Sequence, residues 1–534
     1  MMNVLLKILQ NSITYAEWER VGIRTHHGVA LPLFSLHSER SCGIGEFLDL
    51  LPLLEWCHKI GFDVIQLLPI NDSGNDPSPY NALSSCALNP LYLSLEILPY
   101  LSKHSDLRAG LRDLKRLNQT SRVAYGIVKS HKISWLRHYF EQTSEKLIKS
   151  ASFIEFIEKN SWVKPYALFK TLKDHLEQTS WQTWPQEFQN LSEQALDSLI
   201  EHYWKDASFY MVLQYLCFEQ LCFVRAFAKK LKILLKGDIP ILISPESADV
   251  WYHSTLFDLS LAAGAPPDTY NPKGQYWGFP LFNWDAHKKE NYRWWKERLS
   301  SASNYYDLYR IDHVVGFFRI WGIPLEGDPK EGKFYPDIAD LWIPQGRSLL
   351  QMMIDECPML PIAEDLGTIP DGVRTCLKEL GICGTKVMRW ERYWEEDRRF
   401  IPYREYNPIS MTCVSTHDSE TLAGWWRAYP EEAKAFAAFK NWQFTPFLGH
   451  KEQEEILRDS HHTASLFHIN LLQEYLALFP DFVSEDPSDE RINIPGKILE
   501  TNWTYRFRPS VEKLNENLPL QEMMRSMINH RPFP

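Results

Sequence analysis

The chain has 534 residues, a formal net charge of −11 at pH 7 and a hydrophobic fraction of 44%. This length is enough to bury a large core, and the composition is that of an ordinary globular protein. The acidic balance disfavours a nucleic-acid-binding surface and a polybasic membrane contact. Aromatic residues make up 13% of the chain, with 20 Trp. They fit an aromatic core, and they also fit stacking against the flat faces of sugar rings.

Nine cysteines lie scattered along the chain without a CxxC pair or a zinc-binding pattern. Free thiols of this kind favour a reducing compartment over a disulfide framework. The apolar run at Met1–Gln10 is too short for a signal peptide and lacks a small-residue cleavage site. No stretch reaches the ~18 apolar residues of a membrane span. We expect a cytoplasmic protein with no nucleic-acid or membrane partner.

Eight apolar, β-branched runs that end in turn or polar residues predict eight strands. In chain order they are Gly28–Leu36, Asp63–Pro69, Ile239–Ser244, Tyr306–Asp312, Leu360–Glu364, Thr385–Trp390, Met411–Thr416 and Arg491–Ile494. Helical patterns separate most of them, at Glu46–Ile60, Tyr210–Lys236, Asn291–Ser301 and Ile369–Leu380. Alternation of strand and helix predicts an α/β fold with a parallel sheet, and eight repeats favour closure into a (β/α)8 TIM barrel.

Two intervals between predicted strands are too long for simple loops. Residues 71–205 are charged but carry recurring apolar residues, which predicts a large inserted helical subdomain. A second insertion is expected near residues 420–488, between the last two predicted strands. A helical extension is expected over residues 1–27, and residues 28–534 are expected to form one catalytic body.

Three predicted strands run into carboxylates, at Asp312, Glu364 and Asp418. A barrel of parallel strands presents the carboxyl ends of its strands on one face, so these three groups are expected to converge on one pocket. Cleavage of a glycosidic bond with retention needs two carboxylates in different protonation states. The chain therefore offers such a pair and a third acid.

The sequence around two of these acids predicts different roles for them. Arg310 and Asp312 are two residues apart on one strand, so their side chains leave on the same face. A neighbouring guanidinium keeps a carboxylate ionised, as a nucleophile requires, although a structural ion pair is the alternative. Glu364 ends an apolar strand, where desolvation raises the pKa as a general acid requires. Asp365 points the other way and is expected to be a structural hydrogen-bonding group, although either acid could be the functional one.

Other motifs near the strand ends are compatible with sugar binding. His417 and Asp418 could clamp neighbouring hydroxyls of a sugar, and a hydrogen-bonded turn is the alternative. Residues 263–282 are rich in Gly, Pro and aromatics, which predicts a stiff lid loop that stacks on substrate or packs against the barrel. Tyr80 follows the second predicted strand and could stack on the reacting sugar or be a buried structural tyrosine.

Taken in order, the motifs resemble those of the amylomaltases, the 4-α-glucanotransferases or disproportionating enzymes of glycoside hydrolase family seventy-seven. The matches begin with Ser-Pro-Tyr at 78–80, Gly-Asp-Ile-Pro at 237–240, Ser-Ala-Asp-Val-Trp at 247–251, Ala-Gly-Ala-Pro-Pro-Asp at 263–268 and Gly-Gln-x-Trp-Gly at 274–278. They continue with Arg-Ile-Asp-His at 310–313, Ala-Glu-Asp-Leu-Gly at 363–367, Thr-His-Asp at 416–418, Arg-x-Asn-x-Pro-Gly at 491–496 and Asn-Trp-x-x-Arg at 502–506.

The resemblance implies a (β/α)8 barrel with helical insertions that moves α-1,4-glucan segments from a donor to the 4-hydroxyl of an acceptor glucan or glucose. It implies that Asp312 is the nucleophile, Glu364 the general acid/base and Asp418 the third carboxylate, which grips the sugar. It also implies a set of substrate-binding residues within the motifs: Tyr80, Arg310, His417, Trp277, Tyr270, Ser78, Asp268 and Asn493. No metal or organic cofactor is expected.

The chain departs from the family pattern in the lid. Thr269 stands where a second aromatic is common, and Phe279 stands where Asn is common after Trp-Gly. Both changes concern the choice of acceptor and not the chemical centre. Two alternatives to a transferase stay open on the sequence: an α-amylase-like hydrolase with the same barrel, and a glucan-binding scaffold that has lost catalysis.

Overall fold

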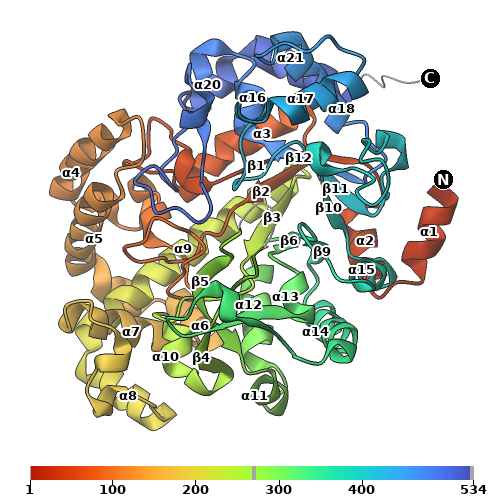
Figure 1. Cartoon of the computed structure of the whole chain (residues 1–534). Coiled ribbons are helices and arrows are strands. Elements are labelled where there is room, and N and C mark those ends of the chain that lie inside the picture. The colour runs from red at the N-terminus through yellow and green to blue at the C-terminus, as the bar shows by residue number, and fades with distance from the viewer. Residues whose placement is uncertain (1, 268–271, 530–534) are drawn as a thin grey trace.

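The computed structural model describes residues 2–267 and 272–529, and its centre is a barrel of parallel strands (Figure 1). The eight strands are β1 (His26–Leu31), β2 (Val64–Leu67), β3 (Leu234–Ile239), β6 (Leu308–Ile311), β9 (Leu360–Ala363), β10 (Gly384–Val387), β11 (Ser410–Cys413) and β12 (Phe467–Leu471). They pair in the order β10-β11-β12-β1-β2-β3-β6-β9. A parallel bridge between Ile362 and Cys383 joins β9 to the residue before β10 and closes the ring. The predicted fold class is confirmed.

The structure corrects two of the predicted strands. The third is predicted at Ile239–Ser244, but β3 ends at Ile239, where that range begins. The apolar residues after Pro240 are buried outside the strand. A buried loop and a buried strand can share the same short apolar run, so the sequence does not distinguish them. The eighth strand was placed at Arg491–Ile494, which is wrong, because the strand is β12. The interval 420–488 therefore contains the last strand and does not separate the last two.

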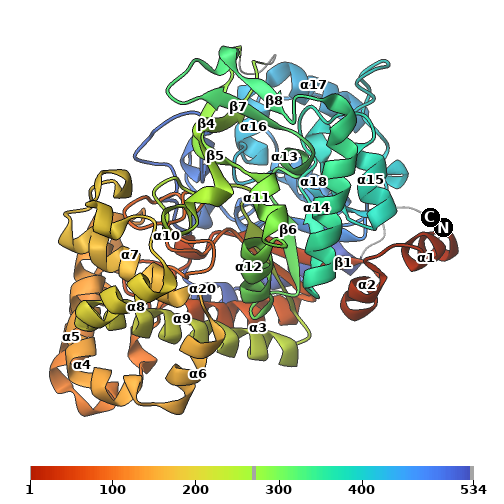
Figure 2. The ribbon, with the colours of Figure 1, turned by 90° about the horizontal axis from the view of Figure 1, so that it is seen from below.

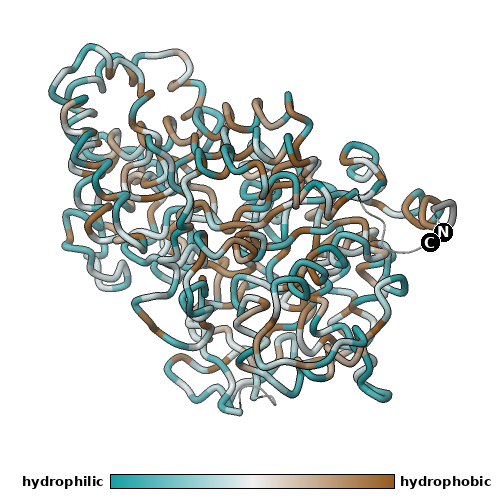
Figure 3. The backbone as a smooth tube through the Cα atoms, turned by 90° about the horizontal axis from the view of Figure 1, so that it is seen from above, coloured by the Kyte–Doolittle hydropathy of each residue, from teal (hydrophilic) through white to brown (hydrophobic). Residues whose placement is uncertain are grey.

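Helices surround the barrel on its outer face. Those between or after the strands are α3 (Leu50–Ile60), α9 (Trp204–Lys230), α10 (Ala248–Tyr252), α11 (Trp284–Lys289), α12 (Arg293–Ser303), α13 (Val315–Phe318), α14 (Trp342–Glu356), α15 (Val373–Leu380), α16 (Leu422–Ala428), α17 (Pro430–Phe439), α18 (His450–Ser460) and α19 (Leu472–Leu476). The terminal helices are α1 (Met2–Gln10), α2 (Tyr15–Val21), α20 (Val511–Glu516) and α21 (Leu518–Asn529). Apolar residues concentrate along the inner segments of the tube in Figure 3.

The segment between β2 and α9 forms a block of helices beside the barrel (Figure 2). Its helices are α4 (Ser105–Lys115), α5 (Tyr125–Ile148), α6 (Ala151–Lys159), α7 (Val163–His175) and α8 (Glu193–His202). Both α5 and α7 pack against α9, which leads into β3. Among the described residues, α9 is the one helix long and apolar enough to cross a membrane, but 78% of its most apolar window is buried inside the protein. It is therefore a core helix that joins this block to the barrel.

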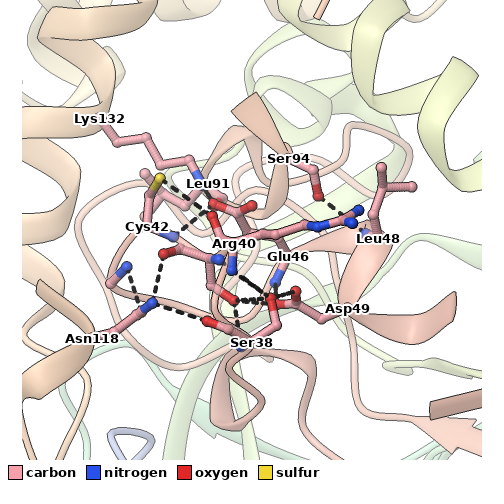
Figure 4. A network of polar contacts seen from close by, with 12 residues as sticks. Ser38, Arg40, Cys42, Glu46, Leu48, Asp49, Leu91, Ser94, Asn118 and Lys132 are labelled. Atoms are coloured by element: carbon pink, nitrogen blue, oxygen red, sulfur yellow. Dashed lines mark hydrogen bonds and ion pairs between the residues drawn. The ribbon is translucent and has the colours of Figure 1, made fainter. Parts of the chain in front are cut away.

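A buried ion pair fastens α5 to the first loop of the barrel (Figure 4). The ammonium group of Lys132 lies 2.5 Å from Glu46 Oε1 and 2.7 Å from the carbonyl of Leu91. Both charged side chains are almost completely buried. The backbone N–H of Cys42 also donates to Glu46 Oε1, at 3.0 Å. Each charge thus has several partners, as a buried ion needs if it is not to destabilise the fold.

Replacing Lys132 with methionine is expected to lower the free energy of unfolding by about 3–5 kcal/mol, because Glu46 would remain buried without its counter-charge. Urea denaturation and limited proteolysis of the α4–α5 region would measure the change. The matched control is Lys149→Met, which breaks the exposed Lys149–Glu145 pair at the C-terminal end of the same helix and should change little. Equal effects of the two substitutions would contradict this account of the ion pair.

A second, antiparallel sheet stands over one side of the barrel and corrects the predicted lid loop. Its strands are β4 (Phe257–Ala265), β5 (Gln275–Phe282), β7 (Ile320–Pro324) and β8 (Lys333–Tyr335). Most of segment 263–282 is therefore a strand hairpin. A Cβ on Gly264 would lie 2.1 Å from the carbonyl oxygen of Gln275, so this glycine serves close strand pairing and not a turn. Asp268, Thr269 and Tyr270 lie outside the described residues.

Candidate active site

The three predicted acids follow three strands of the barrel at the same end. Asp312 comes directly after β6, Glu364 directly after β9, and Asp418 lies in the loop that follows β11. These are the fourth, fifth and seventh barrel strands. Because all eight strands are parallel, the ends of these strands face one mouth of the barrel.

Arg310, on β6, holds two of the acids together. Its Nη1 lies 2.9 Å from Asp312 Oδ1, and its Nη2 lies 2.7 Å from Glu364 Oε2. The two nitrogens belong to one rigid guanidinium fork, so the two carboxylates lie side by side. The side chains of Asp312 and Glu364 keep 20% and 25% of their surface exposed, against 10% for Arg310. The acids thus face the mouth, and the cation lies beneath them.

A fourth carboxylate, Asp238 on β3, also binds Arg310. Asp238 and Arg310 are opposite each other in the parallel register of β3 and β6. Both oxygens of the fully buried Asp238 side chain lie 2.8 Å from Arg310 Nη1, and the hydroxyl of Tyr80 donates to Asp238 at 2.8 Å. The sequence prediction missed this residue because it started the third strand at Ile239. The signal in the sequence was the position of Asp238 in the Gly-Asp-Ile-Pro motif at 237–240.

Glu364 is suited to carry a proton near neutral pH. Burial raises its pKa, the nearby charge of Asp312 raises it further, and Arg310 opposes both, with the result that the pKa lies at about 7. The backbone N–H of His313 donates to Glu364 Oε2 at 2.8 Å and fixes the carboxyl group. A carboxyl group with this pKa can donate a proton and later accept one.

Asp365 does not join the carboxylate group. It accepts hydrogen bonds from the backbone N–H of Thr385 at 2.7 Å and from Arg374 Nε at 3.1 Å. Its side chain is buried away from the mouth. The prediction that Asp365 is a structural hydrogen-bonding residue is confirmed.

Asp418 and His417 form the other wall of the site. Asp418 Oδ1 accepts from the side-chain amide of Asn493 at 2.7 Å, and Asp418 Oδ2 lies 3.3 Å from His417 Nε2. Partial burial favours a higher pKa for Asp418, but His417 and the hydrogen bond from Asn493 outweigh it and hold the pKa at about 2. Burial likewise opposes the charge on His417, and Asp418 outweighs it, so the pKa of His417 is raised. Asp418 is therefore ionised at neutral pH.

Aromatic side chains pack around these acids. The rings of Tyr80 and His417 stack with centroids 5.2 Å apart and planes 16° apart. Trp503 contacts both rings, at 5.5 Å and 5.9 Å, and was not among the predicted site residues. Trp277, on β5, meets His313 edge-on at 5.1 Å. The hairpin of the second sheet thus reaches the residue next to Asp312.

Three predicted binding residues are not placed in this group. The backbone N–H of Ser78 donates to Asp76 at 2.8 Å, and no hydrogen bond among the described residues joins its hydroxyl to the three acids. Asp268 and Tyr270 lie outside the described residues. Within residues 2–267 and 272–529, no group of three or more His, Cys, Asp or Glu could hold a metal ion.

Comparison with known proteins gives a consistent result. The family described as 4-alpha-glucanotransferase matches residues 31–512. A 4-alpha-glucanotransferase of Chlamydia caviae is 48% identical over 511 residues, covering 95% of this chain and 96% of the relative. One from Thermus thermophilus is 30% identical over 476 residues, covering 85% of this chain and 89% of the relative. The structure resembles an amylomaltase of Streptococcus agalactiae in complex with acarbose, with a TM-score of 0.79, 24% identity and coverage of 95% and 99%. At that identity the structural likeness concerns the fold.

Proposed function

This chain belongs to the 4-alpha-glucanotransferases of glycoside hydrolase family 77, and from that premise we propose that Asp312, Glu364 and Asp418 perform its reaction by double displacement. The enzyme transfers segments of α-1,4-glucan. The observation that carries the proposal is the single guanidinium of Arg310 bound to Asp312 and Glu364. Retaining enzymes keep their two carboxyl groups about 5–5.5 Å apart, and a shared arginine fork favours such a spacing.

In the first step, Asp312 attacks the anomeric carbon of the donor glucan. Arg310, 2.9 Å away, stabilises the negative charge of this carboxylate. Glu364 gives its proton to the departing glycosidic oxygen, so the bond to that oxygen breaks as the bond to Asp312 forms. The products are a glucanosyl group esterified to Asp312 and a shortened glucan with a free 4-hydroxyl.

In the second step, Glu364 acts in reverse. As a carboxylate it takes the proton from an incoming hydroxyl, which attacks the anomeric carbon and releases Asp312. A 4-hydroxyl of another glucan or of glucose gives transfer, and water gives hydrolysis. Both outcomes use the same carboxylates, so the ratio depends on acceptor binding and on the exclusion of water. We expect the hairpin that carries Trp277 to control the ratio of transfer to hydrolysis.

The third acid holds the sugar that reacts. Asp418 is ionised at neutral pH, with one oxygen on Asn493 and the other near His417, an arrangement suited to bind neighbouring hydroxyls. Tyr80 and His417 form one aromatic stack beside it. The complex of the Streptococcus agalactiae amylomaltase with acarbose supports binding of a glucan-like ligand on this fold. Ser78, Asp268, Tyr270 and Trp277 remain proposed contacts further along the glucan.

Several broader proposals complete this picture. Residues 28–534 would act as one catalytic body, with a helical extension at residues 1–27 and the helical block near 71–205 as an insertion. The substrates would be α-1,4-glucans, namely maltooligosaccharides and glycogen-derived dextrins, with glucose as a further acceptor. Nine free cysteines, eight of them buried, support a reducing, cytoplasmic location.

Incubation with maltotriose tests the proposed function. Transfer would yield glucose together with oligomers longer than maltotriose, at a constant number of reducing ends. A gain in reducing ends without longer products would identify a hydrolase. No turnover with retained glucan binding would identify a scaffold.

The pKa of Glu364 predicts the alkaline limb of the pH profile. The free enzyme must hold Glu364 protonated to act as the acid, and its pKa is raised to about 7. We therefore expect kcat/KM for maltotriose to be high below pH 7 and to fall about tenfold per pH unit well above it. Initial rates from pH 5 to 9 would measure this. A flat profile up to about pH 9 would contradict Glu364 as the acid.

A further inference from the structure

We propose that Arg491 is a positioning residue that sets the contact between Asp418 and Asn493, and so the grip on the reacting sugar. The inference rests on the proposed function of Asp418. Asp418 and Asn493 come from loops that lie far apart in the chain, one after β11 and one after β12. Arg491 is the side chain that binds the backbone of both.

The contacts of Arg491 reach each residue of the pair. Its Nη2 donates to the backbone carbonyl of Asp418 at 3.0 Å and to the backbone carbonyl of Asn493 at 2.9 Å. Its Nε donates to the same Asn493 carbonyl at 3.2 Å. One guanidinium group therefore fixes the main chain on both sides of the 2.7 Å hydrogen bond between the two side chains.

The guanidinium of Arg491 in turn forms an ion pair with Glu420. Arg491 Nη1 lies 2.5 Å from Glu420 Oε1, and the other oxygen of Glu420 lies 3.4 Å from Arg389 Nη2. The Arg491 side chain is 13% exposed and that of Arg389 is 2% exposed. The clamp is thus built into the protein and has few alternative rotamers.

The other hydrogen bonds that fix the Asp418 loop are made by its neighbours and not by Asp418 itself. Within the loop, the backbone N–H of Thr416 donates to Ser419 Oγ at 2.9 Å. Glu474 accepts hydrogen bonds from the Ser415 hydroxyl at 2.5 Å and from the backbone N–H of Leu422 at 3.1 Å. Between these points, the side chain of Asp418 remains 44% exposed. A half-exposed carboxylate on a loop has several orientations, and Arg491 and Asn493, together with His417, select one of them.

Lysine cannot replace arginine in this clamp. The three nitrogens of the planar Arg491 guanidinium bind three different oxygens, whereas a lysine ammonium is a compact charge on a flexible stem. Arg491→Lys keeps the charge opposite Glu420 but loses the planar fork. A merely electrostatic or structural role would be satisfied by lysine.

The test is a double-mutant cycle between Arg491→Gln and Asp418→Asn, measured as kcat and KM for maltotriose transfer. Arg491→Gln should lower kcat about 10- to 100-fold with a smaller change in KM, because a small misplacement of a group that acts in the transition state costs on this order. In the Asp418→Asn background the same substitution should change kcat less than about threefold. On a logarithmic scale, Arg491→Lys should recover less than half of the kcat that Arg491→Gln loses.

Two further variants serve as controls. Glu420→Gln loosens Arg491 without removing it and should give an intermediate loss of kcat, even if Arg491→Gln folds poorly. Arg427 lies on the neighbouring helix α16 and forms an exposed ion pair with Asp486. Arg427→Gln breaks this pair and should leave kcat unchanged. The inference is overturned if Arg491→Gln and Glu420→Gln keep kcat within twofold of the parent, or if Arg491→Gln loses the same factor in both backgrounds. If Asp418→Asn alone transfers at the parent rate, the proposed function of Asp418 fails instead.

Discussion

Replacing Asp312 with asparagine is expected to lower the rate of maltotriose transfer by about four orders of magnitude or more, a loss typical of removing a covalent nucleophile. Asparagine has nearly the same shape but no charge, so it cannot form the glucanosyl ester. Arg310 would still bind Asp238 and Glu364, and the barrel should stay folded. Product chromatography after long incubation would measure the residual rate.

The matched control for this variant is Asp340→Asn. Asp340 is an exposed aspartate in the short helix Ala339–Leu341, and its substitution should leave transfer unchanged. Comparison of melting temperatures would separate a catalytic loss from misfolding. Undiminished transfer by a folded Asp312→Asn enzyme would rule out Asp312 as the nucleophile.

Replacing Glu364 with glutamine is expected to lower maltotriose transfer about 10²- to 10⁴-fold, as for loss of a general acid/base. The size of the loss should depend on the leaving group. Fluoride departs without protonation, so α-maltosyl fluoride should still glycosylate Asp312 in this variant. The second step would remain slow because no base activates the acceptor. A burst of about one fluoride per enzyme, followed by slow release, is therefore expected.

The leaving-group dependence is the discriminating result for Glu364. If maltotriose and maltosyl fluoride lose the same factor on Glu364→Gln, then Glu364 does not protonate the leaving oxygen. A steady fluoride release without a burst would place the base elsewhere.

The positions of the three acids could be predicted because they depend on simple local rules. Apolar strands end in polar residues where a barrel meets solvent, and alternation along a strand places Arg310 and Asp312 on one face. Both features can still be predicted when the strand bounds are wrong by a few residues. The arginine fork between Asp312 and Glu364 then follows from the pairing of β6 with β9.

Other parts of the site could not be predicted from local pattern. Asp238 contacts Arg310 because the two residues are opposite each other in the pairing of β3 with β6. This register depends on both strands and cannot be read from the sequence of one. β12 was missed because its residues His468 and Asn470 are polar yet fully buried in the barrel, so the strand lacks an apolar run. The hairpin was predicted as a loop because Gly and Pro mark turns in most sequences, whereas here Gly264 allows two strands to approach closely.

The central claim is that Asp312 forms the covalent glucanosyl-enzyme, and trapping that intermediate tests it most directly. Glu364→Gln enzyme would be mixed with α-maltosyl fluoride, quenched in acid, digested and examined by mass spectrometry. A maltosyl group is expected on the peptide that contains Asp312, and this group should be lost when a glucan acceptor is added before the quench. A fluoride burst with the sugar on a different residue, or with no sugar on the protein, would contradict it.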